Sequence, residues 1–345
     1  MAPAGSGVGP NPPLAVTMGE PAGIGGELTL MAWLALHATG PAFMVLDDPV
    51  RLRTLAARCG FEVPIQPVET PSQAAAIFPT ALPVLPIPMQ GAVGAGHPEP
   101  AAAKAVIASI EQSVSLARRG EVAAIVTNPI HKAALYDSGF RFPGHTEFLL
   151  ELAGGPASGH RAVMMLASDM LRVVPVTVHL PLRRAIETLT TEMIVDAGVI
   201  TAEALGRDFA IGRPRLAVAG LNPHAGESGT LGDEERHIVA PAVRALQSLG
   251  IDAKGPLPPD TMFHAAARAG YDAALCMYHD QALIPLKTLD FFGGVNVTLG
   301  LPFVRTSPDH GTAFDIAGTG KADPQSFLAA ISLAAKMAQQ RKARA

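Results

Sequence analysis

Short apolar runs alternate with amphipathic stretches along most of the chain. The apolar runs predict buried strands at residues 14–18, 42–46, 122–127, 162–168, 215–220 and 272–278. The amphipathic stretches predict helices at 101–119, 190–205, 233–249 and 260–269, and a last helix over 324–345 that ends in RKAR. Strands that alternate with helices are typical of a largely parallel sheet covered on both faces, so the pattern predicts an α/β fold.

Three segments depart from this alternation. Residues 64–100 contain many prolines and little charge, and predict an irregular connection or an excursion that carries strands. Residues 28–46 are uncharged, but Gly40 and Pro41 divide them, so we expect a buried helix followed by a strand instead of a membrane span. The first thirteen residues lack the basic start and apolar centre of a signal peptide and predict a loose tail.

Composition narrows the class of protein. A chain of 345 residues suits two or three domains, or one large α/β body with a cleft, and 48% hydrophobic residues exclude disorder of the whole chain. A net charge of -4 with 16% charged residues provides no basic surface for nucleic acid. Cys59 and Cys276 lie too far apart in sequence to suggest a disulfide scaffold, which favours a reducing cytoplasm.

Polar residues gather directly after the predicted strands. In a parallel sheet the carboxyl ends of the strands carry the ligand sites. His179, His224 and His279 each follow such a strand, and three imidazoles with one open position describe a catalytic metal site. Their separations of 45 and 55 residues match no local metal motif, and a single histidine is more often an ordinary surface residue. Their shared position at strand ends makes them metal candidates.

Two acidic residues, Asp260 and Asp280, are candidates to act together with these histidines. Asp280 follows His279 directly, and Asp260 opens a predicted helix. Each could simply cap a helix, or could orient a histidine or bind a substrate hydroxyl or amino group.

A second group of residues suits an anion. His145 and Thr146 open a helix, where Thr146 could be an ordinary cap or the free N–H groups could bind an anion. Lys287, Asn296 and Arg305 lie in an apolar segment, either as scattered surface charges or as partners of a phosphate or carboxylate.

The glycine-rich stretch MGEPAGIGG does not match a dinucleotide fingerprint. Its glycines have the wrong spacing, and no acidic residue is expected to close the second strand. A tight turn into a helix explains it as well. The sequence also contains no Walker A motif, nucleophile elbow or CxxC pair.

Taken together, these blocks resemble the 4-hydroxythreonine-4-phosphate dehydrogenase family, which belongs with the isocitrate and isopropylmalate dehydrogenases. The resemblance runs from Thr17 to the helix after Asp323 and rests on ordered blocks: TNPIHKAAL, GHTEF, PVTVHLPL, GLNPHAGESGTLGDEE, GPLPPDT, MYHDQALIPLK and GVNVTLGLPFVRTSPDHGTAFDIAGTG. It implies two α/β/α subdomains with a cleft between them and no Rossmann fold. The expected boundaries are 1–137 with 310–345 for the cofactor side, and 138–309 for the metal, substrate and dimerisation side.

The resemblance also assigns roles to residues. It makes His179, His224 and His279 the ligands of a divalent metal, with zinc expected and magnesium or cobalt as alternatives. Substrate contacts fall on His145, Thr146, Lys287, Asn296 and Arg305, and cofactor contacts on His310, Gly311 and Asp315. His145, Lys287, Asp260 and Asp280 are the catalytic candidates, and the residue that takes the proton stays open among them.

The implied activity is oxidation of 4-phosphooxy-L-threonine by NAD or NADP, in a cytoplasmic homodimer whose sites draw on both subunits. The 3-oxo acid formed would lose carbon dioxide to give 3-amino-2-oxopropyl phosphate, in pyridoxal phosphate biosynthesis. No membrane or nucleic-acid partner is expected.

Two departures keep other substrates open, because the family often has asparagine where His131 stands and aspartate where Glu20 stands. The alternatives are a paralogue that oxidises phosphorylated threonate or erythronate or a terephthalate cis-dihydrodiol, and a non-redox phosphate-binding or acyltransferase-like protein.

Overall fold

The computed structural model describes residues 12–136, 139–142 and 144–344, so residues 1–11 of the expected tail lie outside the description. The chain forms two compact units. The first comprises residues 1–140 and 311–324, and the second comprises residues 141–310 and 325–345.

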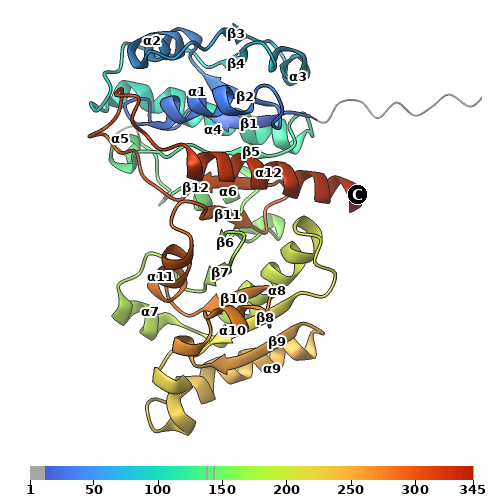
Figure 1. Ribbon diagram of the computed structural model, residues 1–345. Coiled ribbons are helices and arrows are strands. Elements are labelled where there is room, and N and C mark those ends of the chain that lie inside the picture. The colour runs from blue at the N-terminus through green and yellow to red at the C-terminus, as the bar shows by residue number, and fades with distance from the viewer. Residues whose placement is uncertain (1–11, 137–138, 143, 345) are drawn as a thin grey trace, which may run out of the picture. The chain divides into compact units, whose positions relative to one another are not determined.

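The first unit contains a parallel sheet. Its strands lie in the order β3 (Ile65–Pro67), β4 (Leu82–Pro86), β2 (Phe43–Asp47), β1 (Leu14–Thr17) and β5 (Ile125–Val126). The helices of this unit are α1 (Gly25–Leu36), α2 (Pro49–Cys59), α3 (Ala74–Ile77), α4 (Ala103–Arg118) and α5 (Lys132–Tyr136), with 3₁₀ turns η1 (Pro71–Gln73) and η2 (Pro100–Ala102). Figure 1 shows α2 and α3 in blue beside β3 and β4.

The sequence of α2 shows why this helix starts and stops where it does. Asp48 caps it by accepting hydrogen bonds from the N–H groups of Val50 (2.8 Å) and Arg51 (3.1 Å), and Pro49 occupies the first helical position. Gly60 ends the helix in the left-handed conformation at φ 72°. The helix therefore begins directly at the carboxyl end of β2.

The second unit contains a mixed sheet. The strand order is β12 (Arg305–Pro308), β11 (Val295–Leu299), β6 (Val163–Ala167), β7 (Arg172–Pro175), β10 (Ala273–Cys276), β8 (Arg215–Ala219) and β9 (Asp252–Leu257). From β7 to β9 the neighbouring strands are parallel, whereas β11 runs antiparallel to β12 and β6, and β6 runs antiparallel to β7. The expectation of a largely parallel sheet thus holds for the first unit and for the strands that precede the three histidines.

Besides its strands, the second unit contains α-helices and short helical turns. The helices are α6 (His145–Leu152), α7 (Leu182–Thr188), α8 (Thr191–Asp208), α9 (Ala240–Ser248), α10 (Ala265–Arg268), α11 (His279–Leu289) and α12 (Gln325–Arg344). The turns are η3 (Pro156–Ser158), η4 (Pro223–Gly229), the π-helical η5 (Glu235–Val239) and η6 (Pro259–Thr261). In Figure 1, α9 lies alongside β9 and α12 runs along β12.

Most of the expected elements are confirmed. Each of the six predicted strands coincides with an observed strand, and residues 64–100 carry β3 and β4. Residues 28–46 contain most of α1, followed by β2, and no helix in the described part of the chain is long and apolar enough to cross a membrane.

The helix expected over 260–269 is wrong. Residues Pro259–Thr261 form a 3₁₀ turn, and α10 begins only after His264, whose extended backbone (ψ 159°) breaks the helical path. Asp260 caps neither segment, because Pro258 stands at the N-cap of the 3₁₀ turn and His264 caps α10.

The C-terminal helix groups with the second unit. It packs on β12, β11 and α8, whereas the resemblance placed residues 310–345 on the cofactor side. The functional subdomain boundaries stay a prediction.

Candidate active site

Three neighbouring parallel strands carry the candidate histidines at one edge of the second unit. His179 follows β7, His279 is the first residue of α11 after β10, and His224 lies in η4 after β8. The strands β7, β10 and β8 are adjacent in that order, so their carboxyl ends lie side by side. The rings of His179 and His279 approach to 5.6 Å between centroids.

Two of these histidines have a strained backbone. His179 has φ 53° and His224 has φ 52°, the left-handed region that side chains disfavour. His224 also begins a run of six residues, 224–229, that all have positive φ. Each non-glycine residue in this region costs about 1–2 kcal/mol, and such strain persists where the surroundings impose it, most often at functional sites.

Asp280 orients the ring of His279. A hydrogen bond of 2.7 Å joins His279 Nδ1 to Asp280 Oδ1. An ionised carboxylate only accepts, so Nδ1 donates and Nε2 is the ring atom left for a metal or a proton. The alternative that Asp280 caps α11 is wrong, because Tyr278 is the residue at the cap. Asp260 is exposed on η6, which packs against the turn η4 that carries His224.

The donor types fit a divalent metal, but the described residues do not bring three of them together. Imidazole nitrogens suit zinc and similar ions. Within the described residues, however, no group of three or more histidine, cysteine or acidic side chains converges closely enough to hold an ion.

Arg305 is buried beside Asn296. It is 4% exposed on β12, and its Nη1 donates to Asn296 Oδ1 (3.4 Å) and to Thr298 Oγ1 (3.0 Å) on β11. Burial lowers the pKa of Arg305 to about 10. Arg305 is thus a desolvated cation in the sheet, and the alternative that it is a scattered surface charge is wrong.

Lys287 has a carboxylate partner that is not evident from the sequence. Its Nζ lies 2.7 Å from Asp309 Oδ2 and 5.5 Å from the ring centre of Phe291. Asp309 stands directly before the cofactor candidate His310. This position was the one feature of the sequence that could have indicated a role for Asp309.

His145 and Thr146 occupy the first turn of α6. Gly144 is the residue at the N-cap and provides no side-chain bond, so Thr146 is not the cap. Both side chains are half-buried, and the N–H groups of this turn suit an anion.

The loop with the cofactor candidates is anchored in the first unit. The buried carboxylate of Glu27 accepts from the N–H groups of Gly318 and Gly320, the latter at 3.0 Å. The Thr312 carbonyl accepts from Ile24 N–H (3.0 Å). Gly311 and Asp315 stay exposed on this loop. His310 belongs to the second unit, so its position relative to this loop is not described.

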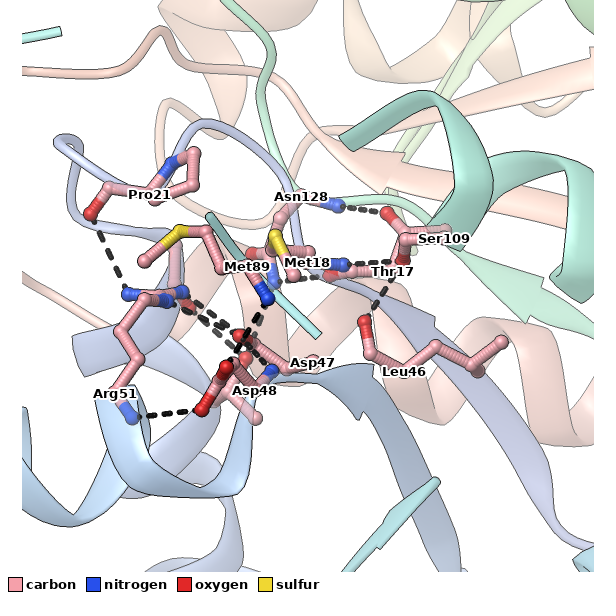
Figure 2. Close-up of polar contacts among 12 residues, drawn as sticks. Thr17, Met18, Pro21, Leu46, Asp47, Asp48, Arg51, Met89, Ser109 and Asn128 are labelled. Atoms are coloured by element: carbon pink, nitrogen blue, oxygen red, sulfur yellow. Dashed lines mark hydrogen bonds and ion pairs between the residues drawn. The ribbon is translucent and has the colours of Figure 1, made fainter. Parts of the chain in front are cut away.

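An acidic residue does close the second strand of the first unit, contrary to expectation. Asp47 ends β2, and Figure 2 shows Arg51 directed at it, with Nε–Oδ1 3.0 Å and Nη2–Oδ2 2.8 Å. Burial raises the pKa of Asp47, although Arg51 opposes this effect. Because Arg51 occupies both carboxylate oxygens, Asp47 offers little to a ribose.

The two departures from the family pattern lie near each other. Glu20 is buried, and burial raises its pKa, while Ala22 N–H and the charges of His131 and Arg51 oppose this effect. The His131 ring meets the ring of Phe314 edge to face at 5.1 Å between centroids. His131 thus lies beside the loop that contains Gly311 and Asp315, and Glu20 lies close enough to His131 to interact with its charge.

Comparison with known proteins places this arrangement in a family. A 4-hydroxythreonine-4-phosphate dehydrogenase from Caulobacter vibrioides is 56% identical over 331 residues, covering 95% of this chain and 98% of the relative. The crystal structure of a 4-hydroxythreonine-4-phosphate dehydrogenase from Klebsiella pneumoniae superposes with a TM-score of 0.85 at 39% identity, covering 95% of this chain and 99% of that one.

A terephthalate 1,2-cis-dihydrodiol dehydrogenase from Burkholderia xenovorans is more distant, with a TM-score of 0.64 at 28% identity and coverage of 94% and 97%. The profile of the pyridoxal phosphate biosynthetic protein PdxA family matches residues 40–334. On these matches, and on a shared α/β fold, this chain belongs to the PdxA family of pyridoxal phosphate biosynthetic proteins.

Proposed function

We propose that this dehydrogenase oxidises 4-phosphooxy-L-threonine, with NAD or NADP as the hydride acceptor, in pyridoxal phosphate biosynthesis. The observation that carries the proposal is the buried Arg305–Asn296 pair on β12 and β11, in the same compact unit as the three strand-end histidines. A desolvated guanidinium favours an anionic substrate, because an anion restores the interactions that burial removes.

Different residues of the chain interact with different groups of the substrate. Arg305, Lys287 and Asn296 bind anionic groups, and the first turn of α6, with His145 and Thr146, supplies further donors. His145, Lys287, Asp260 and Asp280 are the candidates for removing the hydroxyl proton. A 3-oxo acid product loses carbon dioxide readily, because the neighbouring carbonyl accepts the electrons of the breaking bond.

His179, His224 and His279 are the residues that would hold a divalent ion, for which zinc is our first assignment and magnesium or cobalt are alternatives. Such an ion would supply stabilisation of the negative charge that develops on the substrate oxygen. Because one chain does not bring the three side chains together, we propose that a homodimer completes the set across its interface. His310, Gly311 and Asp315 would contact the nicotinamide cofactor.

We also place the protein in the cytoplasm. Cys59 and Cys276 are both free thiols, and Cys276 is buried in β10, which suits a reducing compartment.

Formation of the reduced nicotinamide cofactor tests which substrate the protein oxidises. The zinc-loaded protein is mixed with NAD or NADP and 4-phosphooxy-L-threonine, and we expect absorbance of the reduced cofactor to rise. Parallel reactions contain phosphorylated threonate, phosphorylated erythronate or a terephthalate cis-dihydrodiol. A faster reaction with one of these would replace the proposed substrate.

The dihydrodiol is the second candidate, because of the similarity to the dehydrogenase that acts on this class of compound. An absence of reduced cofactor with all four substrates would favour the non-redox phosphate-binding or acyltransferase-like alternative.

A further inference from the structure

A buried glutamine links the two strand ends that lead to His279 and His224. Gln281 is 8% exposed on the first turn of α11. Its Oε1 accepts from Met277 N–H (2.6 Å) at the end of β10, and its Nε2 donates to the Gly220 carbonyl (2.8 Å) at the end of β8. One side chain therefore ties the start of the helix that bears His279 to the strand end before His224.

A buried carboxylate holds the residues that directly follow the same strand end. Glu235 is 3% exposed, and its Oε1 accepts from the N–H groups of Leu221 (2.8 Å) and Asn222 (2.7 Å). Its Oε2 accepts from Asn222 Nδ2 (2.9 Å). Gly220, Leu221 and Asn222 are thus held through their main chain by two buried side chains, two residues before the left-handed turn begins at His224.

The left-handed turn also lies directly against Glu235. A Cβ atom at Gly226, where φ is 75°, would come within 2.5 Å of Glu235 Oε2, so only glycine fits this approach. The strain at His224 and the residues after it requires such an external restraint, because unrestrained residues relax to right-handed or extended conformations.

We propose that Gln281 and Glu235 form a polar clamp that positions His224 and His279 for metal binding. Removing Gln281's amide leaves the buried Gly220 carbonyl and Met277 N–H without these partners, which favours displacement of both strand ends. The clamp acts through the histidine-bearing segments, so both are positioning residues. The inference rests on the proposed metal site, and its test separates the two.

The first variant is Gln281→Met, which keeps the length of the side chain and removes both hydrogen bonds. The matched control is Gln247→Met on α9, where Nε2 donates to the Ala253 carbonyl (2.8 Å) outside this network. Two quantities are measured on the full chain: zinc affinity by competition with a chromogenic chelator, and amide hydrogen exchange of residues 220–229 without metal.

We expect Gln281→Met to weaken zinc binding about 10- to 100-fold, as loss of partners behind metal ligands does, and to speed exchange in residues 220–229. Gln247→Met should change neither quantity. If Gln281→Met matches the control in both measurements, the clamp is overturned. Glu235→Gln, which replaces a carboxylate oxygen by an amide group of similar size, serves as a second variant should Gln281→Met fail to fold, and the same criteria apply.

The metal assignment is tested on its own with His224→Ala. If that variant binds zinc as tightly as the unmodified chain, the assignment falls, and exchange of residues 220–229 alone decides the clamp. Faster exchange in Gln281→Met with an unchanged control would then support it, and equal exchange would overturn it.

Discussion

Arg305 and Lys287 are the side chains whose loss should most directly reveal the substrate's charge. Arg305 is buried in the sheet beside Asn296, and Lys287 lies within the same unit with Asp309 as its partner. We expect Arg305→Ala or Lys287→Ala to raise KM for the phosphorylated substrate about 10- to 100-fold, the value of one hydrogen bond to a charged group. KM for NAD should change little, because the expected cofactor contacts are other residues.

Steady-state kinetics with each reactant varied in turn measures this difference. Because Arg305 is buried, its variant is first compared with the unmodified chain by thermal unfolding. An equal rise in KM for NAD and for the phosphorylated substrate would indicate a folding defect and contradict the assignment.

Tyr271 provides a prediction about stability at high pH. Burial raises the pKa of Tyr271 to about 12, and its hydroxyl donates to the Met262 carbonyl (2.9 Å). The folded protein therefore keeps a proton that the unfolded chain loses near pH 10. The stabilisation is complete below pH 10 and is lost as pH rises toward 12.

Since the ring keeps contact with water, we expect the loss in the free energy of unfolding to be about 1 kcal/mol. Urea unfolding at a series of alkaline pH values measures it. Tyr271→Phe should remove this part of the pH dependence, and Tyr136→Phe, at an exposed tyrosine, should retain it. If both variants lose the same free energy of unfolding at alkaline pH, Tyr271 is not the source of this pH dependence.

At the scale of elements, Asp208 joins the C-terminal ends of α8 and α12. This buried carboxylate accepts two hydrogen bonds from Arg207 (both 2.9 Å) and two from Arg341 (both 2.8 Å). Burial alone would raise the pKa of Asp208, but the bonds from Arg341 and Arg207 outweigh it and hold the pKa below its usual range. The bonds to ionised Asp208 therefore stabilise the folded protein above about pH 4, and this stabilisation is lost as the pH falls through the lowered pKa of Asp208.

We expect Asp208→Asn to lower the free energy of unfolding by about 2–3 kcal/mol, less than for a fully buried pair because both arginines touch water. The variant should also lose less stability than the unmodified chain on acidification. Asp196→Asn breaks the exposed pair with Arg161 and should cost no more than about 0.5 kcal/mol. Equal costs for the two variants, measured by urea unfolding at neutral pH, would contradict the role given to Asp208.

At the scale of the whole molecule, the proposed metal site leads to a prediction about activity in mixed dimers. If His279 of one subunit completes a site with His179 and His224 of another, a mixed dimer of two inactive variants contains one intact site. We therefore expect His279→Ala and His224→Ala proteins to recover activity when mixed under conditions that exchange subunits. Exchange is verified with differently tagged chains, and an absence of recovery after proven exchange would show that each chain builds its own site.

Local sequence indicated the candidate residues and most of the expected elements, although the helix expected over 260–269 is not formed. An apolar run such as residues 272–278 is too short and too continuous for an amphipathic helix, so β10 and the position of His279 after it were predictable. The ordered motif blocks were likewise sufficient to indicate the family. These features depend on residues close together in the chain.

Tertiary structure decided which of these residues meet, because strand order depends on contacts between distant segments. The approach of His179 to His279 follows from the pairing of β7 with β10, and the Arg305–Asn296 pair follows from an antiparallel register that no local pattern expresses. Folding likewise buries Glu235 and Gln281, which look like ordinary polar residues in sequence, around a single strand end. Burial gives their hydrogen bonds the strength to impose a strained turn, and burial is a property of the folded chain alone.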